Sequence, residues 1–179
     1  TDRSRGLGDV YKRQVYNTYA IGGCDLSATT DLTCATLIIR RSSDDEIVYV
    51  FQHYFLPQKK IDQLDEHNTQ EAPYKIWAER GLVTICEGTR VDYSAVTAWY
   101  CQMRDELKID AFKIGYDRAL AGYWVDEMKA NGFEMCAVAQ GPFTWSQPMR
   151  ELGAALADKK VNYNKNPVLL WCLTNTGVK

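Results

Sequence analysis

The sequence predicts an α/β domain in which helices flank one mixed β-sheet. Apolar runs rich in aromatic and β-branched residues, bounded by turn residues or helical patterns, are typical of buried strands. Short connections join the first three runs and favour an antiparallel meander, whereas helical segments separate the later runs and imply parallel pairing. A chain of 179 residues is long enough to bury one core, so we expect a single domain.

The N-terminal half carries the predicted meander. We expect strands at residues 19–25, 33–41 and 46–57, and the last of these ends at a proline. The polar stretch that follows has helical patterns at residues 59–66 and 73–80. We expect these two helices to cover one edge of the sheet.

The C-terminal half alternates helices and strands. Asp92 is the expected N-cap of an amphipathic helix at residues 93–107. An Asn-Gly pair at residues 131–132 is a typical stop for a helix at residues 119–130. Pro148 is expected in the first turn of a later helix, where proline is tolerated. The other predicted segments are strands at residues 111–117 and 134–140, that later helix at residues 146–158, and a buried apolar stretch at residues 166–173.

Two predicted strands each end in an aspartate. Asp25 ends the first strand, and Asp117 ends the strand that follows the first crossover helix. A mixed sheet of this order, with acids at these two ends, has the ribonuclease H-like topology. Ligands of α/β sheets bind beyond the carboxyl ends of the strands, so two such acids on neighbouring strands could share a divalent metal ion. The structural alternatives are a turn in which Asp25 bonds the Ser27 or Ala28 backbone, and a helix beginning near Arg118 that Asp117 caps.

Composition and charge narrow the function classes. The chain is 46% apolar and 25% charged, as in soluble globular proteins, and no apolar stretch or signal peptide suggests a membrane partner. Its formal charge is −2, and omitting residues 1–14 leaves 17 basic against 21 acidic side chains. A domain that gripped DNA mainly by its own charge would be basic. If the substrate is nucleic acid, other parts of a longer protein must therefore hold much of it.

Cysteine and histidine usage disfavours several other chemistries. The six cysteines show no C-x-x-C spacing and stand mostly in apolar runs, so we expect buried thiols in a reducing compartment. His53 and His67 are the only histidines, and they are not spaced as metal ligands on one helix face. A zinc site, a disulfide framework and a Ser-His-Asp triad are therefore all disfavoured.

An ordered series of short motifs runs through residues 15–179. The motifs are Gly23-Cys-Asp25-Leu-Ser with Thr30-Asp31-Leu-Thr33, Val91-Asp-Tyr93, Tyr116-Asp117-Arg118, Gln140-Gly141, Ser146-Gln-Pro148-Met-Arg-Glu-Leu152, and Asn166-Pro-Val-Leu-Leu-Trp171 with Asn175. In this order they resemble the C-terminal nuclease domain of the large terminase subunit of tailed bacteriophages. The series as a whole is much more specific than any single motif.

The resemblance implies a function and a mechanism. Such proteins package viral DNA with an N-terminal ATPase and cut the concatemer with the nuclease domain. We therefore expect an endodeoxyribonuclease that cleaves concatemeric double-stranded DNA with two Mg²⁺ or Mn²⁺ ions about 3.5–4 Å apart. Asp25 would bridge the ions and Asp117 would bind one of them. The phosphate-loop pattern Gly-x-x-x-x-Gly-Lys-Ser/Thr does not occur, so we expect no ATPase activity and no nucleotide site.

The resemblance also implies partners, a cellular location and domain limits. The expected partners are double-stranded DNA, the ATPase domain of the same full-length protein, the portal and the small terminase subunit, in the cytoplasm of the infected bacterial host. The family's further catalytic aspartate would lie beyond Lys179, so we expect residues 15–179 to be a C-terminally incomplete domain. Residues 9–14 resemble a translated sequencing adapter, and we expect residues 1–14 to be a disordered adapter or assembly scar.

Several residues are weaker candidates for the site. Asp31 could approach the metals, or could bond a neighbouring threonine in its loop. Arg118 could face a DNA phosphate or be a solvated helix residue, and Gln140 could line the same rim because it ends another strand. Asp92 is better explained as a helix cap, and Glu87 as a loop acid. We assign the remaining large aromatic residues to the core, at Trp99, Tyr100, Trp124 and Trp171.

Three other functions compete with the nuclease. An actin- or sugar-kinase-type phosphotransferase has a related sheet, but Ser27 replaces the glycine of its Asp-x-Gly-x-Thr loop and Asp117 is not followed by a second Asp-x-Gly. A transposase or integrase core would share the fold and the metals. A silent scaffold or DNA-binding module is disfavoured by the acidic charge. Manganese-dependent nicking of plasmid DNA, lost in Asp25→Ala, separates the nuclease from the kinase and the scaffold.

Overall fold

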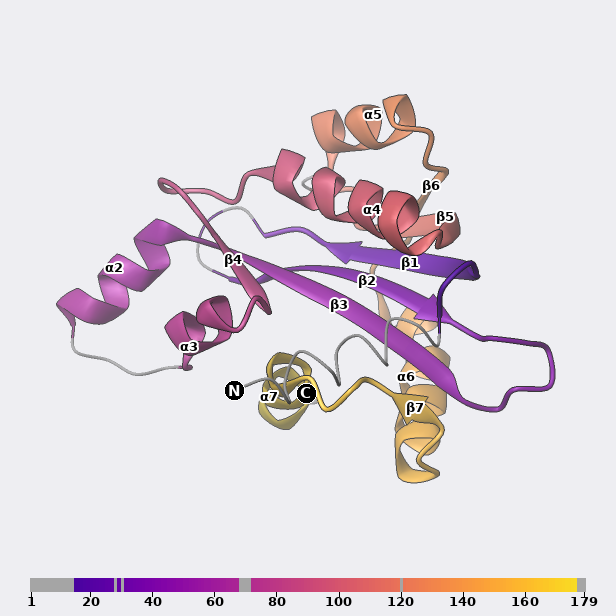
Figure 1. Cartoon of the computed structure of the whole chain (residues 1–179). Coiled ribbons are helices and arrows are strands. Elements are labelled where there is room, and N and C mark those ends of the chain that lie inside the picture. The colour runs from indigo at the N-terminus through magenta and orange to yellow at the C-terminus, as the bar shows by residue number, and fades with distance from the viewer. Residues whose placement is uncertain (1–14, 28, 30, 68–71, 120, 177–179) are drawn as a thin grey trace.

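A mixed β-sheet forms the centre of the molecule (Figure 1). The computed structural model describes residues 15–27, 29, 31–67, 72–119 and 121–176. Within them seven strands run in the order β4-β3-β2-β1-β5-β6, and β7 pairs with β3. The strands are β1 (Tyr19–Asp25), β2 (Thr33–Ile39), β3 (Val48–Pro57), β4 (Val83–Cys86), β5 (Asp110–Tyr116), β6 (Met135–Ala137) and β7 (Val161–Asn162).

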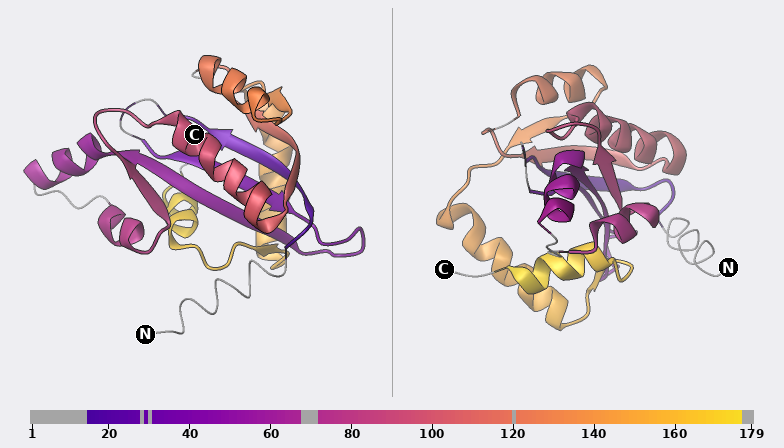
Figure 2. Two further views of the ribbon diagram at one scale, coloured as in Figure 1. Left: turned by 45° about the horizontal axis from the view of Figure 1, so that its top comes forward. Right: turned by 90° about the vertical axis from the view of Figure 1, so that its left-hand side faces the viewer.

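Helices lie on both faces of this sheet. Figures 1 and 2 show α4 and α5 on one face and α3, α6 and α7 on the other, with α2 near one end of β3. The described helices are α2 (Gln58–Glu66), α3 (Tyr74–Glu79), α4 (Tyr93–Leu107), α5 (Gly122–Ala130), α6 (Pro142–Ala157) and α7 (Pro167–Asn175).

The strand pairing confirms the predicted ribonuclease H-like topology. β1 pairs antiparallel with β2, and β2 pairs antiparallel with β3, which is the expected meander. After the crossover helix α4, β5 pairs parallel with β1 and β6 parallel with β5. A helical crossover is the connection that parallel neighbours need. This crossover brings the ends of two strands that are distant in the sequence next to each other.

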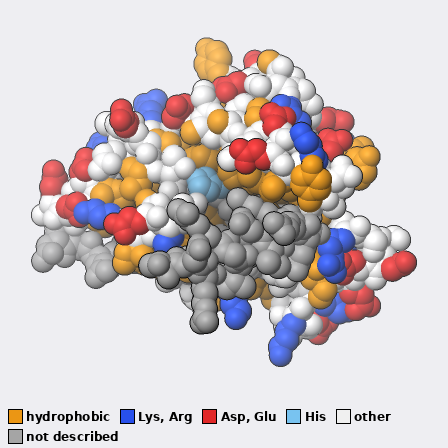
Figure 3. Space-filling view, in the orientation of Figure 1, with side chains coloured by type: hydrophobic (Ala, Val, Ile, Leu, Met, Phe, Trp, Pro, Cys, Tyr) orange, Lys and Arg blue, Asp and Glu red, His pale blue; other side chains and the backbone are white. Residues whose placement is uncertain are grey.

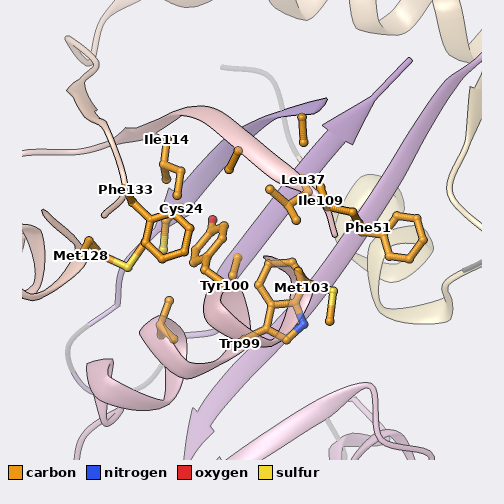
Figure 4. Packing of buried hydrophobic residues seen from close by; sticks show 14 of the residues in the cluster. Cys24, Leu37, Phe51, Trp99, Tyr100, Met103, Ile109, Ile114, Met128 and Phe133 are labelled. Atoms are coloured by element: carbon orange, nitrogen blue, oxygen red, sulfur yellow. The ribbon is translucent and has the colours of Figure 1, made fainter. Parts of the chain in front are cut away.

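The larger core lies between the sheet and helices α4 and α5 (Figure 4). Alternate residues of β2 point into it, including Ala35, Leu37 and Ile39, because side chains of a strand alternate between faces. Helix α4 contributes Trp99 and Tyr100, and Tyr100 is only 1% exposed. The predicted N-cap is confirmed, since the Ser94 N–H donates to Asp92 Oδ1 at 3.0 Å.

A second, smaller core forms where α3 and α7 meet β3 and β4. Tyr74 and Trp77 of α3 contact Trp171 of α7 edge to face, with ring centroids 6.2 and 6.0 Å apart. Such tilted pairs stabilise beyond the area they bury. Trp171 is therefore a packing residue, as predicted, although it is only partly buried.

Several boundaries differ from the prediction, including the start of α5 at Gly122 instead of residue 119. Helix α6 begins at Pro142, not at residue 146, so Pro148 lies inside the helix instead of in its first turn. Gly141 followed by proline is a strong helix start, because proline at the first position loses no hydrogen bond. Strand β6 covers only Met135–Ala137 of the predicted seven residues. The apolar stretch after Asn166 is helix α7, and within it only Val168 is fully buried.

Two strands, β4 and β7, were not predicted at all. They contain four and two residues, which is too short for a period-2 pattern to stand out from the chain around them. Both pair parallel with β3 and extend the sheet beside the meander.

Charged side chains of both signs are interspersed on the face of the molecule drawn in Figure 3. This distribution fits the nearly balanced composition and contrasts with the basic stripe of proteins that bind DNA by charge alone. Among the described helices, none is both long enough and apolar enough to cross a bilayer.

His53 of β3 gives the fold a specific acid sensitivity. Its Nε2 lies 2.7 Å from Thr84 Oγ1 of β4, and its ring packs against Phe55 and stacks on Trp99 of α4. Burial lowers the pKa of His53 from 6.5 to about 4. The folded state therefore resists protonation of this ring, whereas the unfolded chain binds the proton near pH 6.5.

We expect the free energy of unfolding to fall as pH decreases from about 6.5 to 4, with His53 contributing up to about 3 kcal/mol of that loss. His53→Gln should remove this part of the pH dependence, because the amide can still bond Thr84 but does not titrate. Urea denaturation at several pH values measures the effect, with the exposed His67→Gln as control. Identical pH profiles for wild type and His53→Gln would contradict the assignment.

Candidate metal centre

The two predicted acids lie side by side at one end of the sheet. In the parallel β1–β5 ladder Cys24 is the register partner of Tyr116, so Asp25 and Asp117 are the next residues along two neighbouring strands. Both follow a carboxyl end, which is where α/β sheets place their ligands. The structure therefore brings together the two residues that the sequence singled out.

The proximity of these acids affects their protonation. Partial burial, followed by the negative charges of Asp117 and Asp31, raises the pKa of Asp25 above its ordinary value. Like charges disfavour ionisation of a shared site. A bound cation would relieve this repulsion. Asp31, the weaker candidate, is thus close enough to Asp25 for its charge to be felt there.

Local hydrogen bonds bear on the structural alternatives for the two acids. The Ser27 N–H donates to Thr33 Oγ1 at 2.8 Å, so it does not form the alternative turn bond to Asp25. The other candidate partner, Ala28, lies outside the described residues. Asp117 Oδ1 does accept a bond from the Ala119 N–H at 3.0 Å. It caps a turn, because helix α5 begins only at residue 122.

Helix α4 supports the strand that carries Asp25. The Tyr100 hydroxyl donates to the Gly23 carbonyl oxygen at 2.7 Å and accepts from the Thr36 N–H at 3.3 Å. Gly23 and Thr36 are partners in the β1–β2 ladder, so this buried hydroxyl bridges two strands just before the site. The Tyr93 hydroxyl donates to the Ser27 carbonyl oxygen at 3.1 Å and holds the loop beyond Asp25. Buried polar groups that are fully bonded make such an arrangement rigid.

A pocket of about 600 Å³ opens beside the carboxylates, on the face of the sheet away from α4. Its lining includes Asp25, Asp117 and Gln140, so Gln140 lies beside the same pocket as the two acids. Arg118 is exposed and does not belong to this lining. Two aromatic residues in the pocket wall, Phe112 and Trp145, were missed by the reasoning from sequence. The Gly-Pro helix start at residue 141 was the signal that could have placed Trp145.

The donor set fits a hard cation bound together with a substrate. Within the described part of the chain, no group of three or more acids, histidines or cysteines is arranged to hold a metal. Mg²⁺ is commonly bound by one or two carboxylates plus substrate phosphates and water, and needs no complete protein cage. Asp25 and Asp117 meet that requirement.

Comparisons with known proteins give a consistent result. The family model "Terminase large subunit, endonuclease domain" matches residues 9–179. The terminase large subunit of Enterobacteria phage HK97 is 30% identical over 158 residues, which are 87% of this chain and 30% of that protein. Protein YmfN of Escherichia coli K12 is 25% identical over 161 residues, 84% of this chain and 34% of that protein. The chain thus spans about a third of the length of these relatives.

A solved structure shares the fold. The crystal structure of the HK97 bacteriophage large terminase superposes with a TM-score of 0.71, covers 92% of this chain and 34% of its own, and is 24% identical.

Proposed function

Since the chain belongs to the terminase large subunit endonuclease domain family, we propose that it is the metal-dependent endonuclease domain of a phage DNA-packaging terminase. Its reaction would be the hydrolysis of phosphodiester bonds in concatemeric double-stranded DNA. The observation that carries this proposal is the adjacency of Asp25 and Asp117 at the ends of two parallel strands.

Each acid has a role that follows from its position. Asp25 extends a strand held on both sides by ladders, and is suited to bridge two cations; Asp117 is anchored by the Ala119 N–H and is suited to bind one. When bound, Mg²⁺ or Mn²⁺ would supply an activated water and neutralise charge on the phosphate. Asp31, whose charge affects Asp25, would orient water, and Gln140, which lines the same pocket, would contact the substrate strand. Arg118, exposed beside Asp117, is a weaker candidate for a phosphate contact.

The partners follow from the same family. The N-terminal ATPase of a full-length protein, the portal and the small terminase subunit would hold and feed the DNA, which fits a nuclease domain of nearly balanced charge. Action in the cytoplasm of an infected bacterium would give access to replicated viral DNA. The kinase alternative is weaker, because the loop after Asp25 lacks the glycine that a phosphate loop needs.

Plasmid nicking tests the proposal. We expect a full-length protein that carries this domain to convert supercoiled plasmid to open circles with Mn²⁺ or Mg²⁺, and excess EDTA to stop the conversion. Asp117→Ala should reduce the rate by at least about 100-fold, since even residues that only support metal ligands commonly contribute 10- to 100-fold. Cleavage that survives EDTA or the loss of Asp117 would contradict the proposed site. ATP-dependent phosphorylation of a small molecule would support the kinase instead.

A further inference from the structure

The pocket beside the two acids has features of a binding site for a flat ring. Its floor is flat because Gly23 of β1 and Gly115 of β5 are register partners and neither has a side chain. A Cβ at Gly23 would meet nothing within 4 Å, so the space above that residue is open. A Cβ at Gly115 would lie 3.1 Å from Val138 Cγ2, which marks the side wall.

An oriented indole forms another wall. Trp145, in the first turn of α6, is 39% exposed, and its Nε1–H donates to Gln140 Oε1 at 2.9 Å. This bond holds the Trp145 ring and the Gln140 amide together at the edge of the pocket. Phe112 of β5, which is largely exposed, also lines the pocket. An exposed aromatic ring held in place is suited to stack on any nucleobase, since every base has a π-face.

We propose that this pocket holds an unpaired nucleobase of the DNA strand at the cleavage site, stacked on Trp145. The inference rests on the proposed nuclease function. Asp25 and Asp117 line the same pocket as Trp145, so a strand with a phosphate at the acids would have a neighbouring base near the indole. Gln140, which carries amide hydrogens and lines the same space, can bond a base edge.

The charge distribution explains why base stacking is needed here. The pocket lining contains one basic residue, Lys113, and its Nζ lies 3.1 Å from Glu134 Oε1 in an ion pair. Proteins that grip single strands usually combine a basic groove with stacking platforms. Because the one basic residue in this lining is already paired, stacking on Trp145 would supply affinity that phosphate contacts inside the pocket do not.

A fluorescent base tests the inference. We expect a duplex with a single unpaired 2-aminopurine to lose fluorescence on binding the full chain in Ca²⁺, used in place of Mg²⁺ to limit cleavage. Trp145→Ala should abolish this quenching and weaken binding by roughly 5- to 150-fold, the range that stacking of one base supports. Trp145→Phe should keep most of the affinity. The matched control is Phe143→Ala, on the same helix and fully exposed outside the pocket lining.

Two outcomes would overturn the inference: no quenching by the wild-type chain, or equal quenching and affinity in Trp145→Ala. An equal loss in Phe143→Ala would also overturn it, because the effect would then belong to the helix and not to the pocket. The nicking assay separates this failure from failure of the nuclease itself. Metal-dependent cleavage without Trp145-dependent quenching leaves the nuclease intact and removes only the base pocket.

Discussion

Replacing Asp25 by asparagine is expected to lower the rate of metal-dependent cleavage by at least about 100-fold without unfolding the protein. Asparagine keeps the shape of the side chain but loses the charge that a hard cation needs from its ligand. The loss should exceed the 10- to 100-fold typical of residues that only support a metal ligand. Plasmid nicking at saturating Mn²⁺ measures it.

The control for Asp25→Asn lies at the other end of the same pair of strands. Asp110 begins β5 and is exposed, whereas Asp117 follows the opposite end of that strand. Asp110→Asn removes the same charge and should leave cleavage within about twofold of wild type, as expected for a surface substitution away from a site. Equal losses in the two variants would show that overall charge, and not the position of Asp25, determines activity.

Asp25→Asn should also slightly stabilise the metal-free fold at neutral pH. Partial burial and the charges of Asp117 and Asp31 raise the pKa of Asp25, so the folded state favours its protonated form. The stabilisation that protonated Asp25 gives the folded state is fully present below its unfolded pKa of 3.8. It is lost as pH rises through the higher pKa of the folded state. Asparagine avoids the loss, and the gain should stay below about 1 kcal/mol because the carboxyl group is only partly buried and solvent screens its charge. Melting curves should therefore converge near pH 3.

Metal binding provides a second measurement that does not depend on cleavage. A ligand that binds only the folded state raises the melting temperature with its concentration. We expect Mn²⁺ to raise the melting temperature of wild type and to have little effect on Asp25→Asn. An equal shift in both proteins would place the ion elsewhere.

The topology and the two acids could be predicted because both depend on local patterns. Apolar runs mark the strands, and the crossover rule places the strand before Asp117 parallel to the strand before Asp25. The end of each strand then fixes where its acid lies. The order of the elements and the register of one strand pair are therefore enough to place both acids.

The pocket could not be predicted because it depends on where distant elements come to rest. Its wall includes Trp145, whose position depends on the start of α6 at Pro142, four residues before the predicted start. The pocket is also lined by Phe112 of β5, which lies at a shift in the β1–β5 register. Ala20 pairs with Ala111 and the next residue, Ile21, pairs with Lys113, so Phe112 has no register partner in β1. A register shift of this kind has no sequence pattern of its own, and it re-aims side chains near functional sites.

Truncating Trp124 is expected to give the largest loss of stability of any change considered. Trp124 of α5 is 2% exposed and belongs to the core between α4, α5 and the sheet. Trp124→Ala should lower the free energy of unfolding by about 3–5 kcal/mol, because it removes buried apolar area and leaves a cavity. Urea denaturation measures the loss, and activity per folded molecule should change little, since Trp124 does not line the pocket.

Trp124→Phe distinguishes packing from hydrogen bonding at this position. Within the described residues the indole Nε1 of Trp124 is buried and finds no hydrogen-bond partner, and an unsatisfied buried donor costs about 1–3 kcal/mol. Phenylalanine keeps most of the ring but removes that donor, so the two effects should largely cancel and leave a change below about 1.5 kcal/mol. A loss in Trp124→Phe as large as in Trp124→Ala would mean that the indole nitrogen is bonded in solution. If Trp124→Phe instead lowers the free energy of unfolding by an intermediate amount, in proportion to the side-chain volume removed, packing is the dominant contribution of Trp124 to stability.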